Sequence, residues 1–231
     1  MAHSIKRIRT LALVGQSGAG KTTLAEALLA KAGAIPAPGS VERGTTVCDY
    51  TPLEKQLQHS LKLALASFEF QEHRIHLLDT PGYPDFLGHA LPAFAACETA
   101  AIVINAQNGI EMMTGRFLNW AAKRGLDRLI VVNKIDADNV DLEALLDQIQ
   151  QAFGRECLPL NLPAGNRSKV SDCFFAPSGE ADFSSVEEAH RKLVDQVVEV
   201  DEKLMERYLE KARSRRRSYT SRSSARCARG T

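Results

Sequence analysis

The chain has 231 residues, of which 44% are hydrophobic and 25% charged, a balance typical of soluble globular proteins. It has no apolar run as long as a membrane span and no signal-peptide core, so we expect a cytoplasmic protein that binds no membrane. The five cysteines are scattered without a C-x-x-C pair, which argues against disulfides and zinc. The net charge is +1, but residues 211–231 carry eight basic and no acidic residues, so the rest of the chain is acidic.

A glycine-rich loop follows the first predicted strand. Residues 8–14 are an apolar run of strand length, and residues 24–31 are strong helix formers that precede Gly33. Residues 15–22 between them fit the pattern G-x-x-x-x-G-K-[ST], which binds phosphates through its backbone N–H groups. Lys21 would reach the β- and γ-phosphates, and the Thr22 hydroxyl would hold Mg²⁺. The predicted nucleotide-binding residues of this loop are Gly15, Gln16, Ser17, Gly18, Ala19, Gly20, Lys21, Thr22 and Thr23.

The next segment, residues 34–62, is rich in proline, glycine and polar residues. We interpret it as a long loop with turns rather than a packed element, and as a candidate nucleotide-sensing switch. Two strand-like runs follow at 61–70 and 74–78, joined by a short polar link that suits a hairpin. The second run leads into Asp79-Thr80-Pro81-Gly82. There Asp79 can support the Mg²⁺ shell, and Gly82 can offer its N–H group to a γ-phosphate.

Residues 84–98 resemble a helix that Pro92 should kink or restart. A buried strand is predicted at 100–105. A helix is predicted at 111–124, with Met112, Met113 and Trp120 expected in the core. The helix ends at Gly125, and residues 129–132 form the next buried strand.

The last of these strands ends in Asn133-Lys134-Ile135-Asp136. The carboxylate of Asp136 can accept hydrogen bonds from N1–H and the exocyclic amine of guanine, a donor pair that adenine lacks. The amide of Asn133 suits the acceptor edge of the base, and the aliphatic stem of Lys134 can cover its ring. The motif therefore predicts a guanine site.

The remaining chain is less informative. We expect an amphipathic helix at 140–153, an irregular segment at 154–183 with a short strand at 158–162, and a helix from Ser185 to about residue 209. This part is interpreted as a small insert beside the main sheet. The basic tail, residues 211–231, has few apolar residues and should be disordered. Either it binds RNA as an arginine- and serine-rich arm, or it is a non-native sequence created by a reading-frame slip near Lys211.

Taken in order, the three motifs resemble those of translational GTPases, most closely elongation factor G and the bacterial elongation-factor-G-like paralogues, over residues 8–210. The resemblance implies an α/β protein: a doubly wound P-loop sheet at 1–155, an inserted α+β subdomain at 156–210 and the tail at 211–231. It implies GTP or GDP with Mg²⁺ as ligands, possible contact with the ribosome, and no sequence-specific DNA binding. It also implies that the last GTPase strand and its guanine-supporting loop are missing, so guanine nucleotide binding should be weak and translocation absent.

The resemblance also assigns roles to single residues. Lys21, Gly82 and Tyr83 take the catalytic positions, while Asn133, Lys134 and Asp136 contact guanine. The metal ligands are Thr22, Asp79 through water, and a switch hydroxyl for which Ser60 and Thr46 are rivals.

Two departures from the family pattern bear on catalysis. Tyr83 replaces the water-orienting His, and Gly18 replaces an Asp of the phosphate loop. We therefore expect slow or ribosome-dependent hydrolysis. The alternatives left open are a non-catalytic guanine-nucleotide switch, an inactive truncated product, an adenosine-using P-loop kinase or ATPase, and an RNA-binding arm on an inactive domain.

Overall fold

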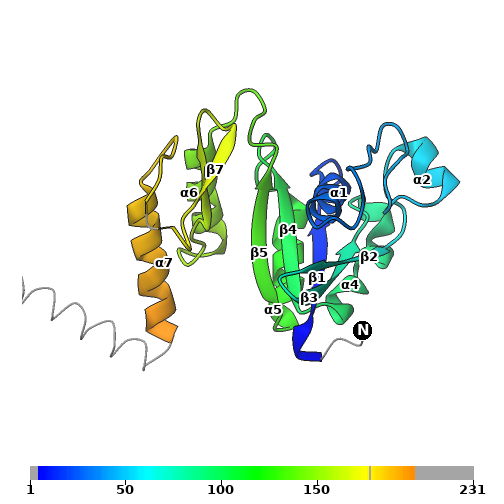
Figure 1. Ribbon diagram of the computed structural model, residues 1–231, viewed down its shortest axis with the longest axis horizontal. Helices are drawn as coiled ribbons and strands as arrows, with labels where there is room; N and C mark the ends of the chain where they lie inside the picture. Colours follow the sequence, from blue (N-terminus) through cyan, green and yellow to red (C-terminus); the bar gives the residue numbers. More distant parts are fainter. Residues whose placement is uncertain (1–4, 177, 201–231) are drawn as a thin grey trace, which may run out of the picture. The chain divides into compact units, whose positions relative to one another are not determined.

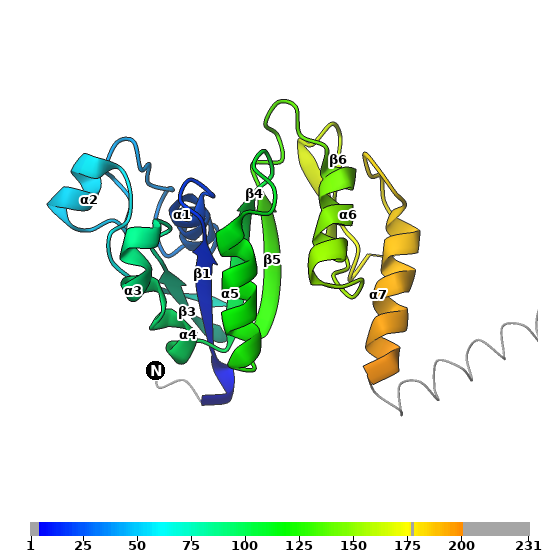
Figure 2. The ribbon, with the colours of Figure 1, turned by 180° about the vertical axis from the view of Figure 1, so that it is seen from behind.

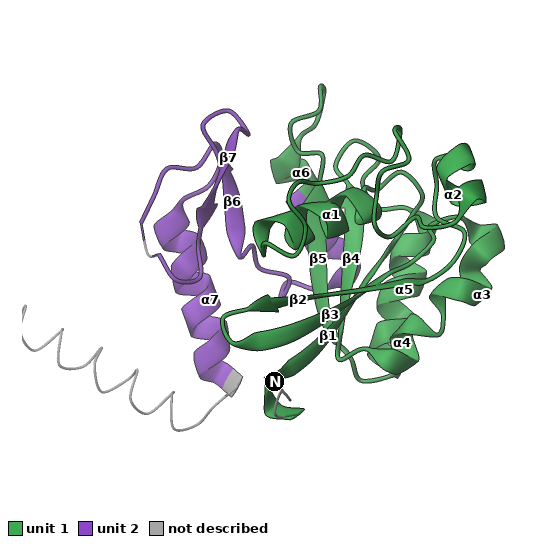
Figure 3. Ribbon diagram, turned by 45° about the vertical axis from the view of Figure 1, so that its right-hand side comes forward, with its two compact units in different colours: residues 1–145 green, residues 146–231 purple. Residues whose placement is uncertain are grey.

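The computed structural model describes residues 5–176 and 178–200, and the predictions for the tail lie outside these residues. The chain divides into two compact units, residues 1–145 and 146–231 (Figure 3). The division falls within helix α6 (Leu142–Phe153), whereas the sequence places the end of the core at residue 155. The assignment of residues 156–210 as an insert stays a prediction.

The first unit is built on a five-stranded sheet (Figure 1). A single turn, η1 (Ile5–Arg7), precedes β1. The strand order is β2-β3-β1-β4-β5, in which β3, β1, β4 and β5 run parallel and β2 is antiparallel to β3. This mixed α/β architecture, dominated by parallel strands, confirms the predicted fold class. The strands are β1 (Ile8–Gly15), β2 (Ala64–Phe70), β3 (His73–Asp79), β4 (Thr99–Asn105) and β5 (Asp127–Asn133).

The register of the parallel strands brings the motifs to one edge of the sheet. Leu13 of β1 pairs with Asp79, and Gly15 pairs with Val103 of β4. At the end of the next pair of strands, Asn105 of β4 lies opposite Asn133 of β5. The carboxyl ends of β1, β3 and β5 therefore lie along the same edge, where open α/β sheets place their ligand sites.

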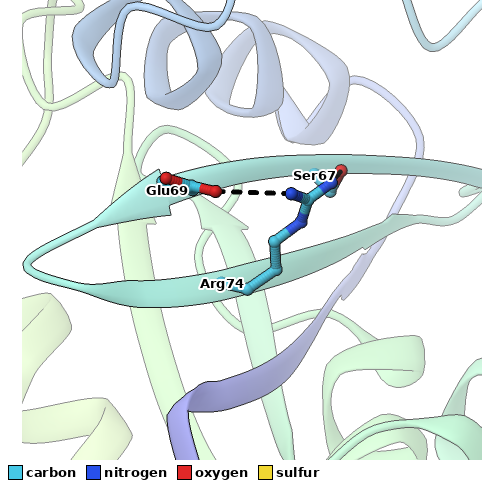
Figure 4. A network of polar contacts seen from close by, with 3 residues as sticks. All are labelled: Ser67, Glu69 and Arg74. Atoms are coloured by element: carbon cyan, nitrogen blue, oxygen red, sulfur yellow. Dashed lines mark hydrogen bonds and ion pairs between the residues drawn. The ribbon is translucent and has the colours of Figure 1, made fainter. Parts of the chain in front are cut away.

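The hairpin of β2 and β3 fixes where β3 ends. Arg74 pairs directly with Glu69 across the two strands, and its guanidinium lies 3.4 Å from the Glu69 carboxylate and 3.4 Å from the Ser67 hydroxyl (Figure 4). Both charged side chains are exposed, so the ion pair adds little stability but agrees with the main-chain register. The same register pairs Ala64 with Asp79 at the other end of the hairpin.

Helices cover both faces of the sheet (Figures 1 and 2). Helix α1 (Lys21–Lys31) packs Ala25 and Leu29 against strand residues that include Leu13 and Leu77. Helix α5 (Met112–Lys123) lies on the opposite face, where Phe117 stacks on Phe94 with ring centroids 6.1 Å apart. One core prediction is wrong: Met112, at the first position of α5, is 70% exposed, whereas Met113 is buried.

Pro92 breaks the helical segment before β4, as expected. The segment consists of η2 (Pro84–Phe86), α3 (Leu87–Ala90) and α4 (Ala93–Ala96). Pro92 stands directly before α4, because its ring cannot continue the preceding turn. Trp120 of α5 meets Phe94 of α4 edge to face.

The segment at 34–62 is more ordered than expected. It contains helix α2 (Pro52–Leu57), whose first turn carries a capping box between Thr51 and Glu54. Thr46, Cys48 and Asp49 are buried, so the segment is packed against the unit. The interpretation as an unpacked loop was wrong, because proline and polar residues here form a cap and a helix.

The second unit pairs a short hairpin with a helix. Strands β6 (Asn161–Ala164) and β7 (Lys169–Asp172) are antiparallel, and α7 (Val186–Val200) packs Val186, Ala189 and Leu193 against Leu162. The strand expected at 158–162 therefore begins three residues later, and its partner was not predicted. The predicted end of the last helix lies outside the described residues. No helix in the described part of the chain is both long and apolar enough to cross a membrane.

Candidate functional site

The glycine loop joins β1 to the start of α1. Lys21, the first residue of α1, is 6% exposed, and its ammonium donates a hydrogen bond to the Gln16 carbonyl at 2.8 Å. Gly20 has φ 89, in the left-handed region that glycine adopts without strain. A β-carbon at Gly20 would also clash with the Asn133 amide. The loop thus needs glycine both for its conformation and for the close approach of a second motif.

Gly82 lies against the same loop from the end of β3. Its carbonyl accepts a hydrogen bond from Ser17 N–H at 3.1 Å. A β-carbon on Gly82 would lie 2.5 Å from both Lys21 Nζ and Ser17 N. Because Ser17 N is a backbone atom that cannot move aside, only glycine lets position 82 approach the phosphate loop this closely. The approach would allow the Gly82 N–H to share a phosphate with Lys21.

Asn133 links the predicted base-binding motif to the phosphate loop. Its amide donates a hydrogen bond to the Ala19 carbonyl at 2.9 Å, across 114 residues of sequence. Lys134 and Asp136 follow with exposed side chains, and Lys134 adopts a left-handed φ of 58. The residues predicted to hold phosphates and those predicted to read guanine therefore meet at one edge of the sheet.

A polar cluster lies beside Lys21. Thr22 Oγ1 donates to Asp79 Oδ2 at 2.7 Å and lies 3.1 Å from Ser60 Oγ. Ser60 Oγ in turn donates to Asp49 Oδ1 at 2.7 Å. The structure thus unites the three predicted metal ligands Thr22, Ser60 and Asp79, and adds Asp49. The rival hydroxyl, that of Thr46, lies 3.2 Å from Asp49 Oδ2.

Burial shifts the pKa values of two charged side chains in this region, Asp79 and Lys21. Asp79 is 1% exposed, and burial raises the pKa of its carboxyl to about 6 although the Thr22 hydrogen bond and the Lys21 charge oppose the shift. Burial also lowers the pKa of Lys21 to about 8, against the opposing effect of Asp79. Both groups stay charged at neutral pH but are more easily neutralised than on a surface.

The cluster has the features of a cation site. The Thr22 and Ser60 hydroxyls make three close oxygen–oxygen contacts but have only two hydrogens between them. One of the three contacts therefore has no hydrogen between its oxygen atoms. Asp79 Oδ1 is the only buried side-chain N or O atom without a hydrogen-bond partner among the described residues. Hydroxyl and carboxylate oxygens are the ligands that Mg²⁺ prefers, with phosphate oxygens and waters completing its shell. The residues present therefore fit Mg²⁺.

This arrangement predicts a pH-dependent metal affinity. Protons compete with the cation for Asp79, whose pKa is about 6, so affinity for Mn²⁺ as a Mg²⁺ substitute should be constant above pH 7. Below pH 6 it should fall by about tenfold per pH unit. Titration of free Mn²⁺ by electron paramagnetic resonance between pH 5 and 8 measures this. Asp79→Asn should bind weakly without the pH dependence, and an identical pH profile in both proteins would contradict the assignment.

Three buried acidic residues, Asp49, Glu26 and Glu54, were not singled out in the sequence. Glu26 is fully buried on α1, and its carboxylate accepts hydrogen bonds from Gly39 N–H at 2.9 Å and Val47 N–H at 2.6 Å. Glu54 accepts from Leu61 N–H and Lys62 N–H at 3.0 and 3.1 Å. The three carboxylates therefore hold the segment that carries Ser60. The spacing Thr51-x-x-Glu54, a capping-box signature, was the signal available for Glu54.

Replacing Glu26 by Ala should destabilise the protein. Two backbone N–H groups lose their acceptor, which we expect to lower the free energy of unfolding by about 2 to 4 kcal/mol. Urea denaturation measures the change. Lys31→Ala, at an exposed position on the same helix, should alter stability by less than about 0.5 kcal/mol. Equal stabilities of the two variants would show that Glu26 does not hold the segment.

Two predicted residues stand apart from these contacts. Thr23 has an exposed side chain on α1. Tyr83 is 42% exposed, and its ring lies 4.7 Å from that of His59, measured between centroids. No sequence motif includes His59.

Comparison with known proteins agrees with this geometry. Residues 6–225 match the family described as the elongation factor Tu GTP binding domain. Over 215 residues the chain is 38% identical to an elongation factor G-like protein of Mycobacterium tuberculosis, covering 87% of this chain and 30% of that protein. It is 36% identical over 168 residues to peptide chain release factor 3 of Nitrosomonas europaea, covering 71% of this chain and 31% of that protein.

A solved structure matches as well. A crystal structure of a Thermus thermophilus protein superposes with a TM-score of 0.78 and 37% sequence identity, covering 88% of this chain and 33% of the other. The chain thus spans about a third of the length of the proteins that it matches. The family match extends to residue 225, beyond residue 210, where the resemblance was expected to end.

Proposed function

Because the chain belongs to the family of elongation factor Tu GTP-binding domains, we propose that it binds GTP and GDP with Mg²⁺ and hydrolyses GTP slowly or in response to the ribosome. The relatives include proteins named as an elongation factor G-like protein and as a peptide chain release factor. Their names support translation as the setting, and we infer that the domain acts in the cytosol with the ribosome as its partner.

The observation that carries the proposal is the hydrogen bond from Asn133 to the Ala19 carbonyl. It ties a loop suited to phosphates to a loop suited to guanine, and a nucleoside polyphosphate is the ligand that needs both at once. Lys21 would neutralise the β- and γ-phosphates, and Gly82 would offer its N–H to the γ-phosphate. Thr22, Ser60 and Asp79 would surround Mg²⁺, with Asp49 orienting Ser60. Asn133, Lys134 and Asp136 would contact the base.

Mg²⁺ would supply charge neutralisation where the β- and γ-phosphates meet. The protein's part is to keep this region rigid: Thr22 is fixed by Asp79, and Ser60 is fixed by Asp49. Ser60 contacts Thr22 directly, whereas Thr46 meets only the far oxygen of the Asp49 carboxylate. This geometry supports Ser60 rather than Thr46 as the switch hydroxyl.

A test of this function measures release of phosphate from GTP under single-turnover conditions, with and without ribosomes. We expect GTP to be bound and then hydrolysed slowly, and ribosomes to raise the rate if they act on this domain. Bound GTP that is never hydrolysed, with or without ribosomes, would favour the second candidate, a non-catalytic switch. Failure to bind GTP in the presence of Mg²⁺ would contradict both.

A further inference from the structure

Two loops converge on the phosphate loop from different parts of the chain. Ser60 reaches it through the 3.1 Å contact with Thr22, and Gly82 reaches it through the hydrogen bond from Ser17 and its proximity to Lys21. Residues 60 and 82 therefore flank the position where a terminal phosphate would lie under the proposed function. His59 and Tyr83 are the residues next to Ser60 and Gly82 in sequence, so both lie within one residue of the groups that flank this position.

His59 and Tyr83 are in contact with each other. Their ring centroids lie 4.7 Å apart at an angle of 59°, and Phe86 contributes a third ring 6.2 Å from His59. His59 is half-buried by this contact, while Tyr83 keeps 42% of its surface exposed. Packing between rings restricts the orientation of the imidazole, because both side chains have few rotatable bonds.

A hydrogen bond fixes which nitrogen of His59 is available. His59 Nδ1 lies 2.9 Å from the Leu57 carbonyl oxygen. A carbonyl only accepts hydrogen bonds, so Nδ1 must carry a proton and donate it. In the neutral imidazole the lone pair is then on Nε2, which can accept a hydrogen bond from water. The Leu57 carbonyl and the Tyr83 ring together hold a defined acceptor on the residue that precedes Ser60.

We propose that His59 orients the water molecule that attacks the γ-phosphate, and that Tyr83 is a positioning residue that acts through the His59 ring. This inference rests on the proposed GTP hydrolysis. In that reaction, the water oxygen forms a bond to the γ-phosphorus as the bond from that phosphorus to the β–γ bridging oxygen breaks. GDP leaves; one proton of the water stays on its oxygen, and the other passes to another oxygen of the inorganic phosphate. His59 Nε2 accepts a hydrogen bond from the attacking water and takes no net proton.

The proposal accounts for Tyr83 at a position where the related GTPases carry the water-orienting His. A phenol ring there supplies a surface for an imidazole from the opposite loop, so the acceptor comes from residue 59 instead of residue 83. Ser60 and His59 are consecutive, so a movement that brings Ser60 toward Thr22 also moves the backbone of His59 toward the phosphate loop. Hydrolysis would then depend on closure of this segment.

The decisive experiment distinguishes the roles of the two ring nitrogens of His59. His59→Asn can keep a donor for the Leu57 carbonyl but has no group at the place of Nε2, whereas His59→Gln can place an amide oxygen near it. With the full chain loaded with Mg²⁺ and GTP, we expect the single-turnover rate of His59→Asn to fall by about tenfold or more, and that of His59→Gln to stay closer to wild type. Tyr83→Ala should also be slower, because the ring that holds His59 is lost. The affinity for GDP should change by less than about twofold in the His59 variants.

His73 provides a matched control. Its Nδ1 makes the same kind of contact, 2.8 Å to the Gln71 carbonyl, but it lies at the start of β3, at the opposite end of that strand from Asp79. His73→Asn should hydrolyse GTP at the wild-type rate. A wild-type rate in His59→Asn would overturn the proposal, as would equal losses in His59→Asn and His59→Gln. Wild-type protein that binds GTP without hydrolysing it would overturn this inference but leave nucleotide binding intact, whereas absence of GTP binding would overturn both.

Discussion

Lys21→Met should strongly weaken nucleotide binding while leaving the protein folded. Lys21 is 6% exposed, and under the proposed function its ammonium would contact two phosphates. Each charge-assisted hydrogen bond is worth about 1.5 to 3 kcal/mol, so loss of two should weaken binding of GDP by at least about 100-fold. Titration with a fluorescent GDP analogue measures this loss.

Stability separates this effect from unfolding. Burial lowers the pKa of Lys21, so the folded protein carries an unfavourable charge there, and the methionine variant should unfold at a higher urea concentration than wild type. Lys31→Met, at the exposed end of the same helix, should bind GDP normally. Nucleotide binding by Lys21→Met that equals that of Lys31→Met would contradict the role of the phosphate loop.

Asp136→Asn should change the base preference from guanine to xanthine. Under the proposed function the carboxylate of Asp136 would accept hydrogen bonds from two donors of guanine, and an amide cannot accept from both. Xanthine has a carbonyl where guanine has its amine, so an Asn amide can donate to it. We expect affinity for GDP to fall by about 100-fold or more and affinity for xanthosine diphosphate to rise. The reason is that Asn with guanine, like Asp with xanthine, leaves a polar atom at the base edge without a hydrogen-bond partner.

The control for this substitution lies two residues further along. Asp138 is also exposed and has the same side chain, so Asp138→Asn makes the same change in net charge. It should leave the ratio of the two affinities at its wild-type value. Competition of the two diphosphates against a fluorescent guanine nucleotide gives the ratio directly. An unchanged ratio in Asp136→Asn would place the base elsewhere.

The sheet and its motifs were predictable from local signals. The apolar runs that became β1 and β4 are nearly continuous, as buried parallel strands require, and each motif directly follows a strand. The prediction that residues 129–132 form a buried strand is wrong, because none of the residues of β5 is buried. Because carboxyl ends of parallel strands share an edge, the order of the motifs along the chain was enough to predict that they meet. The hydrogen bond between Asn133 and the Ala19 carbonyl shows that the first and last motifs do meet.

The buried acids and the aromatic contact were not predictable in the same way. Glu26 lies in a helix-forming run, and only the fold brings the N–H groups of Gly39 and Val47 to its carboxylate. Asp49 and His59 stand in a polar segment without apolar periodicity, so no local pattern distinguishes them from solvated residues. Their partners, Ser60 and Tyr83, are set by tertiary packing.

Calorimetric titration of the 231-residue chain with GDP and with ADP, in the presence of Mg²⁺, shows whether this edge of the sheet holds a guanine nucleotide. If one edge of the sheet holds both a polyphosphate and a guanine base, GDP should bind with one-to-one stoichiometry and at least about 100-fold more tightly than ADP, whatever its absolute affinity. Equal affinities for the two nucleotides, or heat from neither, would contradict the account.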